Sequence, residues 1–345
     1  MRLPKFSSRG QRILKAVGYG AFYWFALIVF AYLTFPYDRL KDRIIHEFNV
    51  RQFGPDAFRL ELDSLSSYWF TGVEADGIRL LSPSKPPTAG AGPPAAELKP
   101  SVLSIDSAHA RVGILPLLIG SVRIRFGADA FDGAISGQTY ESDGTRRLEL
   151  DVEDVALSKA KLLADTVGLP LAGTLGGQVE LALPEGKLAK AEGAIKLKIK
   201  GLSVGDGKAK IRDTIALPKV EAGDLSLEGE STAGQLKILE FSASGPDLEL
   251  SSEGGVRLRD PMQTSLLTLT ARFRFTDRFM GRNDMTRALF GAPGSSVPGL
   301  FDLDPKNKRA KSPDGFYGWR VLGPIAHLQF TPHPSAAGAS AKPKQ

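Results

Sequence analysis

The stretch that decides the fold reads Ile195-Lys-Leu-Lys-Ile-Lys200, in which apolar and basic residues alternate without a break. Alternation with a period of two is typical of a β-strand that buries one face and leaves the other in water. The same alternation recurs at Phe58–Leu62, Val122–Phe126, Leu148–Val152, Leu225–Glu228, Leu248–Ser251, Val256–Arg259 and Phe273–Phe275. The sequence therefore predicts a mainly β protein.

Short glycine-containing pairs separate many of these stretches. Asp-Gly and Gly-Gly pairs suit tight hairpin turns, because such turns require positive φ angles. Such pairs stand at Asp76-Gly77, Asp132-Gly133, Asp143-Gly144, Asp206-Gly207 and Gly254-Gly255, and a Glu-Gly pair stands at Glu185-Gly186. Strands joined by short turns pair mainly antiparallel. We therefore expect a twisted, mostly antiparallel sheet, built either as one curved sheet or as a sandwich.

Three stretches have helical rather than alternating patterns. Asp38–Asn49 places its apolar residues at helical spacing, which predicts a short amphipathic helix. Farther along, Leu157–Val167 and Thr276–Phe290 each precede a break that contains glycine and proline. We predict that these two stretches are short helices that cover an end or an edge of the sheet.

The β-rich part is predicted to be one domain with two flexible loops. The stretch 83–100 is rich in Pro, Ala and Gly, and the stretch 291–314 contains proline and a cluster of basic residues. Alternation continues in the same style on both sides of 83–100, so no domain boundary is expected there. The predicted division is a basic segment at 1–15, an apolar segment at 16–37, a β-rich domain at 38–331 and a disordered tail at 332–345.

An uncharged apolar segment lies near the start of the chain. No charged residue occurs between Ala16 and Tyr37, and the run Val17–Phe35 approaches the roughly 20 residues that a transmembrane helix needs. Bulky residues end the run where a signal peptidase requires small ones, so cleavage is not expected. We predict an uncleaved single-pass anchor that includes Val17, Trp24, Leu27, Ile28 and Phe35.

Basic residues flank this segment on one side only. The first fifteen residues contain no acidic residue and five basic ones: Arg2, Lys5, Arg9, Arg12 and Lys15. Positive flanks are retained in the cytoplasm, so the β-rich domain is expected across the membrane. The remainder of the chain carries 39 of the 44 basic residues against all 38 acidic ones. This near balance lacks the excess of positive charge typical of nucleic-acid binders, so nucleic acid is not expected as a partner.

The sequence contains no arrangement typical of a catalytic or metal site. None of the four histidines stands three or four residues from another, and the chain has no cysteine. No Gly-x-Ser-x-Gly nucleophile motif occurs, and the glycine-rich stretch Gly201–Lys208 lacks the spacing of a phosphate-binding loop. We therefore expect a protein without enzymatic activity, metal or cofactor.

The candidate functional surface is the apolar side of the predicted strands. It is represented by Ile195, Leu197, Ile199, Leu248 and Leu250. Such side chains fill the core of a sandwich, or they line an open groove for acyl chains. An exposed apolar groove of that size would imply a ligand. Periodicity is the same in both cases, so both interpretations stay open.

Several stretches resemble the type II secretion system protein N family, in the same order along nearly the whole chain. They are Tyr32–Ile45, Leu60–Trp69, Gly72–Leu80, Gly176–Leu181, Lys187–Lys190, Gly201–Gly207, Phe241–Leu250, Arg257–Pro261 and Pro313–Trp319. The β-rich part is also similar to AsmA-type periplasmic domains, which are linked to lipid handling between two membranes.

The resemblance implies an accessory or structural subunit of the type II secretion apparatus, without enzymatic activity. Such a subunit is anchored in the bacterial inner membrane, and the bulk of its chain lies in the periplasm. Its partners would be other secretion subunits, and exposed sheet edges offer a natural way to bind them. The likeness to AsmA-type domains implies the alternative, a lipid-binding or lipid-transfer protein that uses the apolar sheet face.

Overall fold

The computed structural model describes most of the chain. The described residues are 8–51, 58–81, 102–118, 120–160, 169–207, 210–211, 215–216, 218–295 and 297–334. The predicted loop at 83–100 lies outside these ranges.

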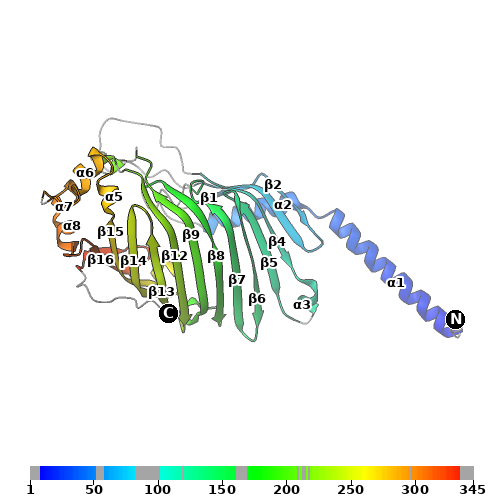
Figure 1. Ribbon diagram of the computed structural model, residues 1–345. Coiled ribbons are helices and arrows are strands. Elements are labelled where there is room, and N and C mark those ends of the chain that lie inside the picture. Colours follow the sequence, from blue (N-terminus) through cyan, green and yellow to red (C-terminus); the bar gives the residue numbers. More distant parts are fainter. Residues whose placement is uncertain are drawn as a thin grey trace, which may run out of the picture.

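One long antiparallel sheet dominates the structure, as Figure 1 shows. Its strands are β1 (Arg59–Glu61), β2 (Ser64–Tyr68), β3 (Gly72–Leu81), β4 (Val102–Val112), β5 (Arg123–Ala130), β6 (Gly133–Ser142), β7 (Thr145–Ala156), β8 (Leu171–Pro184), β9 (Glu192–Val204), β12 (Val220–Thr232), β13 (Gln235–Ser244), β14 (Leu248–Arg257), β15 (Leu266–Phe275), β16 (Tyr317–Pro324) and β17 (Gln329–Pro332). From β3 onward each strand pairs with the next strand named, while β1 and β2 both pair with β3. Strands β10 (Lys210–Ile211) and β11 (Ile215–Ala216) form a separate small pair.

Helices lie mainly at the two ends of this sheet (Figure 1). At one end are α1 (Ser8–Leu33), α2 (Tyr37–Arg51) and α3 (Ile114–Leu118). At the other end are α5 (Asp277–Met280), α6 (Asp284–Phe290), α7 (Leu300–Leu303) and α8 (Pro305–Ala310). Two single 3-10 turns, η1 (Leu188–Lys190) and η2 (Met262–Thr264), connect strands. Helix α2 packs on β1 and β2, and α8 packs on β16 and β17.

The sheet is a single curved layer, which favours the curved-sheet alternative over the sandwich. Register shifts occur between Val152 and Val155, between Ala172 and Thr174, and between Ile238 and Ser242. Such bulges bend a strand and increase its twist. At one end the first residues of β12 extend past the end of β13 and approach β14, where the Asp247 N–H donates to the Glu221 carbonyl oxygen at 3.2 Å. The prediction of a mainly β, antiparallel fold is confirmed.

The predicted turns are confirmed in part. Asp132-Gly133, Asp143-Gly144 and Glu185-Gly186 connect successive strands. Two other predicted turns are wrong, because Asp76-Gly77 lies inside β3 and Gly254-Gly255 lies inside β14. A Cβ atom on Gly254 would stand 2.1 Å from the Thr268 carbonyl oxygen of the neighbouring strand. This glycine therefore allows a close approach of two backbones and does not form a turn.

The helix predictions also have mixed outcomes. The predicted helix Asp38–Asn49 is confirmed within α2. The stretch Thr276–Phe290 forms two helices instead of one. Helix α5 ends at Met280, and the Asn283 side chain accepts a hydrogen bond from the Thr286 N–H, so a new helix, α6, begins there. The beginning of the predicted helix Leu157–Val167 is a turn up to Ala160, and residues 161–168 lie outside the described residues.

The predicted flexible loop at 291–314 is wrong, since it contains α7 and α8. Its polar residues form an internal network that orders the segment. Asp302, which is 8% exposed, accepts a hydrogen bond from the Tyr317 hydroxyl at 2.6 Å and pairs with Lys311 at 2.5 Å. The predicted tail at 332–345 begins too early, because β17 ends at Pro332, and residues 335–345 lie outside the described residues.

Helix α1 contains most of the predicted anchor. Val17, Trp24, Leu27 and Ile28 lie on it with exposed side chains, and Phe35 lies between α1 and α2. Among the residues that the structure describes, no helix is both long and apolar enough to cross a membrane. The single membrane span therefore stays a prediction.

Candidate functional site

The five residues predicted for the apolar face lie on one side of the sheet. Ile195, Leu197 and Ile199 of β9 are half-buried, while the lysines between them are exposed on the opposite side. Leu248 and Leu250 of β14 are half-buried as well. None of the five is in a fully closed core. Ile199 and Leu248 pack against buried residues, so this side of the sheet is covered in part and not by a complete second layer of described residues.

One row of side chains crosses the sheet without a polar residue. Each member stands directly opposite the next across a strand pair, so all of them face the same side. The row runs Val73, Ala110, Phe126, Gly137, Leu150, Val179, Ile195, Gly229, Ile238, Gly254, Leu269, Val321 and Phe330. It connects β3 to β17. We call this row and its neighbours on the same side the apolar face.

A second row widens the apolar face over most of the sheet. It runs Leu65, Ala75, Ala108, Ala128, Ile135, Val152, Gly177, Leu197, Leu227 and Phe241. The opposite side of the same strands carries charged and polar residues such as Glu149, Glu180 and Glu230. The two sides of the sheet therefore differ strongly in polarity.

The sheet curves toward the apolar face. Leu175 of β8 and Leu248 of β14 both pack against the buried cluster of Leu157, Leu202 and Ala222. Strands β8 and β14 are separated by three other strands in the sheet. Leucines from strands this far apart can share one cluster of three residues when the sheet curves toward them, so the apolar face is the concave one at this end.

Aromatic side chains close the far end of the apolar face. Phe279 of α5 is completely buried, and its ring centroid lies 5.4 Å from those of Phe275 and Phe290. Phe301 of α7 adds an edge-to-face contact with Tyr317 of β16 at 5.2 Å. These rings connect α5, α6 and α7 to the last strands, so they form a plug at the end of the curve.

The near end of the apolar face opens beside α1. A cavity of about 640 Å³ lies between the end of this helix and the first strands. Its walls combine Ile28, Tyr32 and Phe35 with Val73 and Ile124 of the sheet. The Tyr32 hydroxyl donates a hydrogen bond to Ser67 Oγ at 2.9 Å, which fixes this end of α1 to the β2–β3 hairpin.

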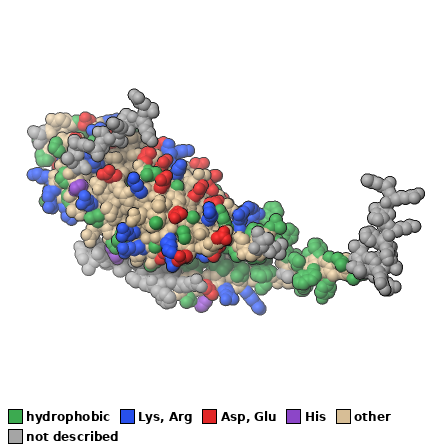
Figure 2. Space-filling model, turned by 90° about the horizontal axis from the view of Figure 1, so that it is seen from below, with side chains coloured by type: hydrophobic (Ala, Val, Ile, Leu, Met, Phe, Trp, Pro, Cys, Tyr) green, Lys and Arg blue, Asp and Glu red, His purple; other side chains and the backbone are tan. Residues whose placement is uncertain are grey.

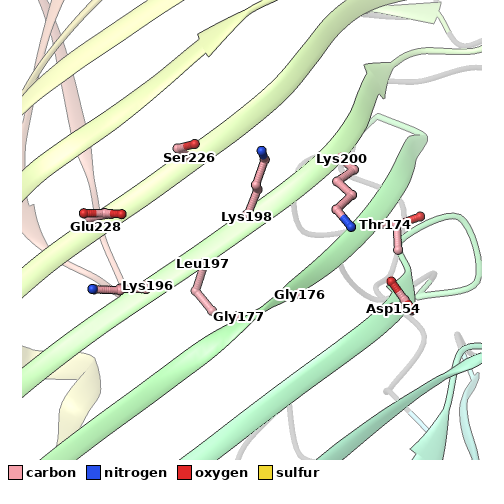
Figure 3. Close-up of a pocket in the computed structure, with 10 residues that line it drawn as sticks. All are labelled: Asp154, Thr174, Gly176, Gly177, Lys196, Leu197, Lys198, Lys200, Ser226 and Glu228. Atoms are coloured by element: carbon pink, nitrogen blue, oxygen red, sulfur yellow. The ribbon is translucent and has the colours of Figure 1, made fainter.

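The polar side of the sheet has a hollow of its own, which Figure 3 shows. It measures about 360 Å³ and forms where Gly176 and Gly177 provide no side chain. Figure 3 shows Lys196 beside Glu228, its cross-strand neighbour, and Lys200 beside Thr174, which is also its cross-strand neighbour. Positive and negative side chains are mixed here, so the hollow has no single charge that would select a ligand.

The carboxyl group of Asp224, which lies beside Lys198 of this hollow, adds a further negative charge. The Gly201 N–H donates to Asp224 at 3.0 Å, and Lys198 lies 3.4 Å from the same carboxyl group. The hydrogen bond from Gly201, with help from Lys198, keeps the pKa of Asp224 below its usual value. Lys198 thus lies beside a carboxyl group whose ionised form is favoured.

The histidines do not come together in space. His46 lies on α2, His109 stacks on Tyr68 at 4.3 Å, His327 lies in the β16–β17 connection and His333 follows β17. Within the described ranges, no group of three His, Asp or Glu side chains has the proximity that a metal ion requires.

Sequence reasoning missed a set of exposed apolar residues at the α1 end of the sheet. Trp69 and Phe70 occupy the β2–β3 turn with 64% and 77% exposure, and Leu115 of α3 is 77% exposed. Figure 2 shows hydrophobic side chains along α1 and at the adjoining end of the sheet, next to basic ones. The apolar run Ile114–Leu118, interrupted by a proline, was the available signal.

Comparison with known proteins adds no relative. No family model, curated protein or solved structure matches this chain. The resemblance to the type II secretion system protein N family therefore stays a prediction, and the function is argued from geometry.

Proposed function

We propose that this chain binds the acyl chains of lipids along its apolar face and has no catalytic step. The observation that carries the proposal is the unbroken apolar row from Val73 to Phe330. Its members from Val73 to Ile195 are half-buried, whereas Leu269 and Val321 near the far end are buried. A folded protein rarely leaves a continuous apolar surface in contact with water unless that surface has a ligand or partner. Acyl chains match such a surface because each buried CH₂ group contributes about 0.8 kcal/mol.

The dimensions of the row suit lipids. Its thirteen residues are separated by twelve strand spacings, and at about 4.8 Å per spacing the row extends for roughly 58 Å along the sheet. A phospholipid acyl chain spans about half of a bilayer core, or roughly 15 Å. The apolar face is therefore long enough for several acyl chains in succession, as binding or transfer along the sheet would require.

We further propose that α1 anchors the protein in the bacterial inner membrane, with the β-rich domain in the periplasm. Two observations support this topology. The side chains of Val17, Phe22 and Phe30 are between 62% and 68% exposed, so α1 has large apolar side chains with little cover. All five basic residues before Ala16 lie on the side of the segment that would stay in the cytoplasm. This placement brings the cavity beside Tyr32 next to the bilayer.

Photocrosslinking in cells tests lipid binding directly. A photoreactive amino acid at Leu197 would face the apolar side, and the same group at Lys196 or Lys198 would face the polar side. We expect lipid adducts by mass spectrometry from position 197 and none from its two neighbours. Equal yields at all three positions, or no adduct at 197, would refute the proposal.

A role in the type II secretion apparatus is the second candidate. It rests on the family resemblance and on one geometric observation, the short terminal strand β17. Among the described residues, this strand pairs with Trp319–Leu322 of β16 and with no other strand, and its residues 329–331 are exposed. A partner strand could add to this edge. Crosslinking from Phe330 in cells should then recover a secretion subunit, and recovery of none would remove this candidate while leaving the lipid proposal intact.

A further inference from the structure

Two arginines face each other across neighbouring strands at the α1 end of the sheet. Arg111 of β4 stands directly opposite Arg125 of β5, on the polar side, and Arg123 lies two residues farther along β5. Like charges directly opposite each other destabilise a sheet unless a counter-charge is present. Among the described residues, no carboxylate forms an ion pair with these three side chains.

A buried donor in this group also lacks a partner. Arg123 Nε has no hydrogen-bond acceptor in the described part of the chain, although it is shielded from solvent. Its guanidinium lies 4.8 Å from the Tyr140 ring centroid, which holds the side chain in place. The carboxylate of Glu149 accepts hydrogen bonds from Gln138 at 2.5 Å and from Tyr140 at 3.5 Å, and among the described residues no ion pair joins it to these arginines. The arginine group therefore has unused hydrogen-bonding capacity for an anion.

These arginines line a cavity of about 560 Å³ together with exposed apolar residues. The cavity, which we call the arginine pocket, is bounded by the β2–β3 turn and by α3. Its rim carries Trp69, Phe70, Ile114 and Leu115, which are 64%, 77%, 53% and 77% exposed. Cationic groups beside exposed aromatic and aliphatic side chains are typical of surfaces that bind the headgroup region of a membrane.

The position of the arginine pocket agrees with this chemistry. Figure 1 shows α3 and β2 at the end of the sheet from which α1 extends. Tyr32, near the end of α1, hydrogen-bonds to Ser67, and its ring lies 5.8 Å from that of Phe70. The rim of the pocket is thus joined to the helix end that leaves the bilayer in the proposed topology.

We infer that the arginine pocket binds the phosphate group of an anionic phospholipid in the bilayer surface, with Trp69, Phe70 and Leu115 inserted among the headgroups. The inference rests on the proposed anchoring of α1 and adds a second contact with the same membrane. Planar guanidinium groups bind phosphate oxygens in bidentate fashion, and the single negative charge of the phosphodiester would reduce the repulsion between the facing pair Arg111 and Arg125. The contact would hold the sheet against the membrane.

Labelling of single cysteines can test this contact in the full chain, because the natural sequence contains no cysteine. We would place an environment-sensitive fluorophore in three variants: Leu115→Cys on the rim, Phe22→Cys on α1 and Leu239→Cys on β13. Each is reconstituted into vesicles of phosphatidylcholine, with and without phosphatidylglycerol. We expect position 22 to be bright in both lipids and position 239 to be dim in both. Position 115 should become several-fold brighter when phosphatidylglycerol is present.

Removal of one arginine then tests the role of charge. In the Leu115→Cys background, Arg125→Ala should raise the phosphatidylglycerol fraction needed for half of the signal about fivefold, the equivalent of about 1 kcal/mol for one basic residue at a membrane surface. Arg147→Ala removes an exposed arginine of β7 outside the pocket and should leave that fraction unchanged. Arg125→Gln repeats the test with a longer polar side chain. The same arginine substitutions in the Leu239→Cys background should leave the signal at position 239 unchanged, which reports that the sheet is folded.

The outcomes separate the two proposals. A dim signal at position 22 would refute the anchoring of α1. A bright signal at 22 with a dim signal at 115 in every lipid would overturn the arginine-pocket inference alone, and would favour a protein partner for this surface. Equal brightness of 115 in both lipids would also overturn it, because the contact would then not depend on the anionic lipid.

Discussion

Replacement of Phe279 is the sharpest test of how the far end of the sheet is held together. Its side chain is fully buried, its ring contacts those of Phe275 and Phe290 at 5.4 Å, and the Arg282 guanidinium lies 4.9 Å from its centroid. Truncation of a buried phenylalanine to alanine costs about 4 kcal/mol. Phe279→Leu keeps much of the apolar volume and loses two ring contacts and the cation–π contact, so about 2 kcal/mol is expected.

This loss should be local, because α5 and α6 contact only one end of the sheet. Hydrogen exchange by mass spectrometry measures such local opening segment by segment. For Asp284–Phe290 we expect protection to fall about a thousandfold in Phe279→Ala and about thirtyfold in Phe279→Leu, since 1.4 kcal/mol corresponds to a factor of ten. Protection of β6 and β7 should not change.

The matched control is Phe330→Ala, because this side chain is 61% exposed. It should change protection by less than a factor of about three, as surface substitutions usually do. Equal effects of Phe279→Ala and Phe330→Ala would refute the assignment of Phe279 to a buried plug. A parallel loss of protection in β6 and β7 would refute the view that the plug opens independently of the sheet.

Two further predictions concern charged groups. Hydrogen bonds from Lys187 and Lys190 lower the pKa of Glu185 from 4.5 to about 2, so the contribution of this group to stability is present above pH 4.5 and is lost as the pH falls toward 2. NMR titration of the Glu185 carboxyl should give that low midpoint, and the double variant Lys187→Ala/Lys190→Ala should return it to near 4.5; a midpoint near 4.5 in the natural protein would contradict the contacts. Burial, with the hydrogen bond to Asp302, raises the pKa of Tyr317, so its hydroxyl remains a donor at alkaline pH. Tyr317→Phe removes a hydrogen bond to a charged group and should reduce the stability of α7 and α8 by about 2 kcal/mol in the same exchange experiment, whereas an unchanged protection would show that the bond to Asp302 contributes nothing.

Local patterns in the sequence predicted the strands well where each feature depends on neighbouring residues. The alternation at Ile195–Lys200 correctly assigned one side of β9 as apolar and the other as charged. The prediction failed where a distant segment decides the role of a residue. Gly254 was predicted to turn the chain, but it makes room for the backbone of β15. The stretch 291–314 was predicted to be a loop, but contacts with Tyr317 and Lys311 stabilise Asp302 in a buried position and order this segment. Tyr317 lies outside the stretch, so the local sequence does not reveal this contact.

The sequence by itself determined that the chain forms amphipathic strands, that its net charge lies almost entirely before Ala16, and that an apolar segment follows. These properties depend on side-chain order alone. Only the tertiary structure decided that the apolar sides join into one row across the sheet, that the sheet bends toward that row, and that Arg111 meets Arg125. The physical reason is that register adds up over many turns and bulges. A shift of one residue at any of them would move a whole strand's apolar residues to the opposite side.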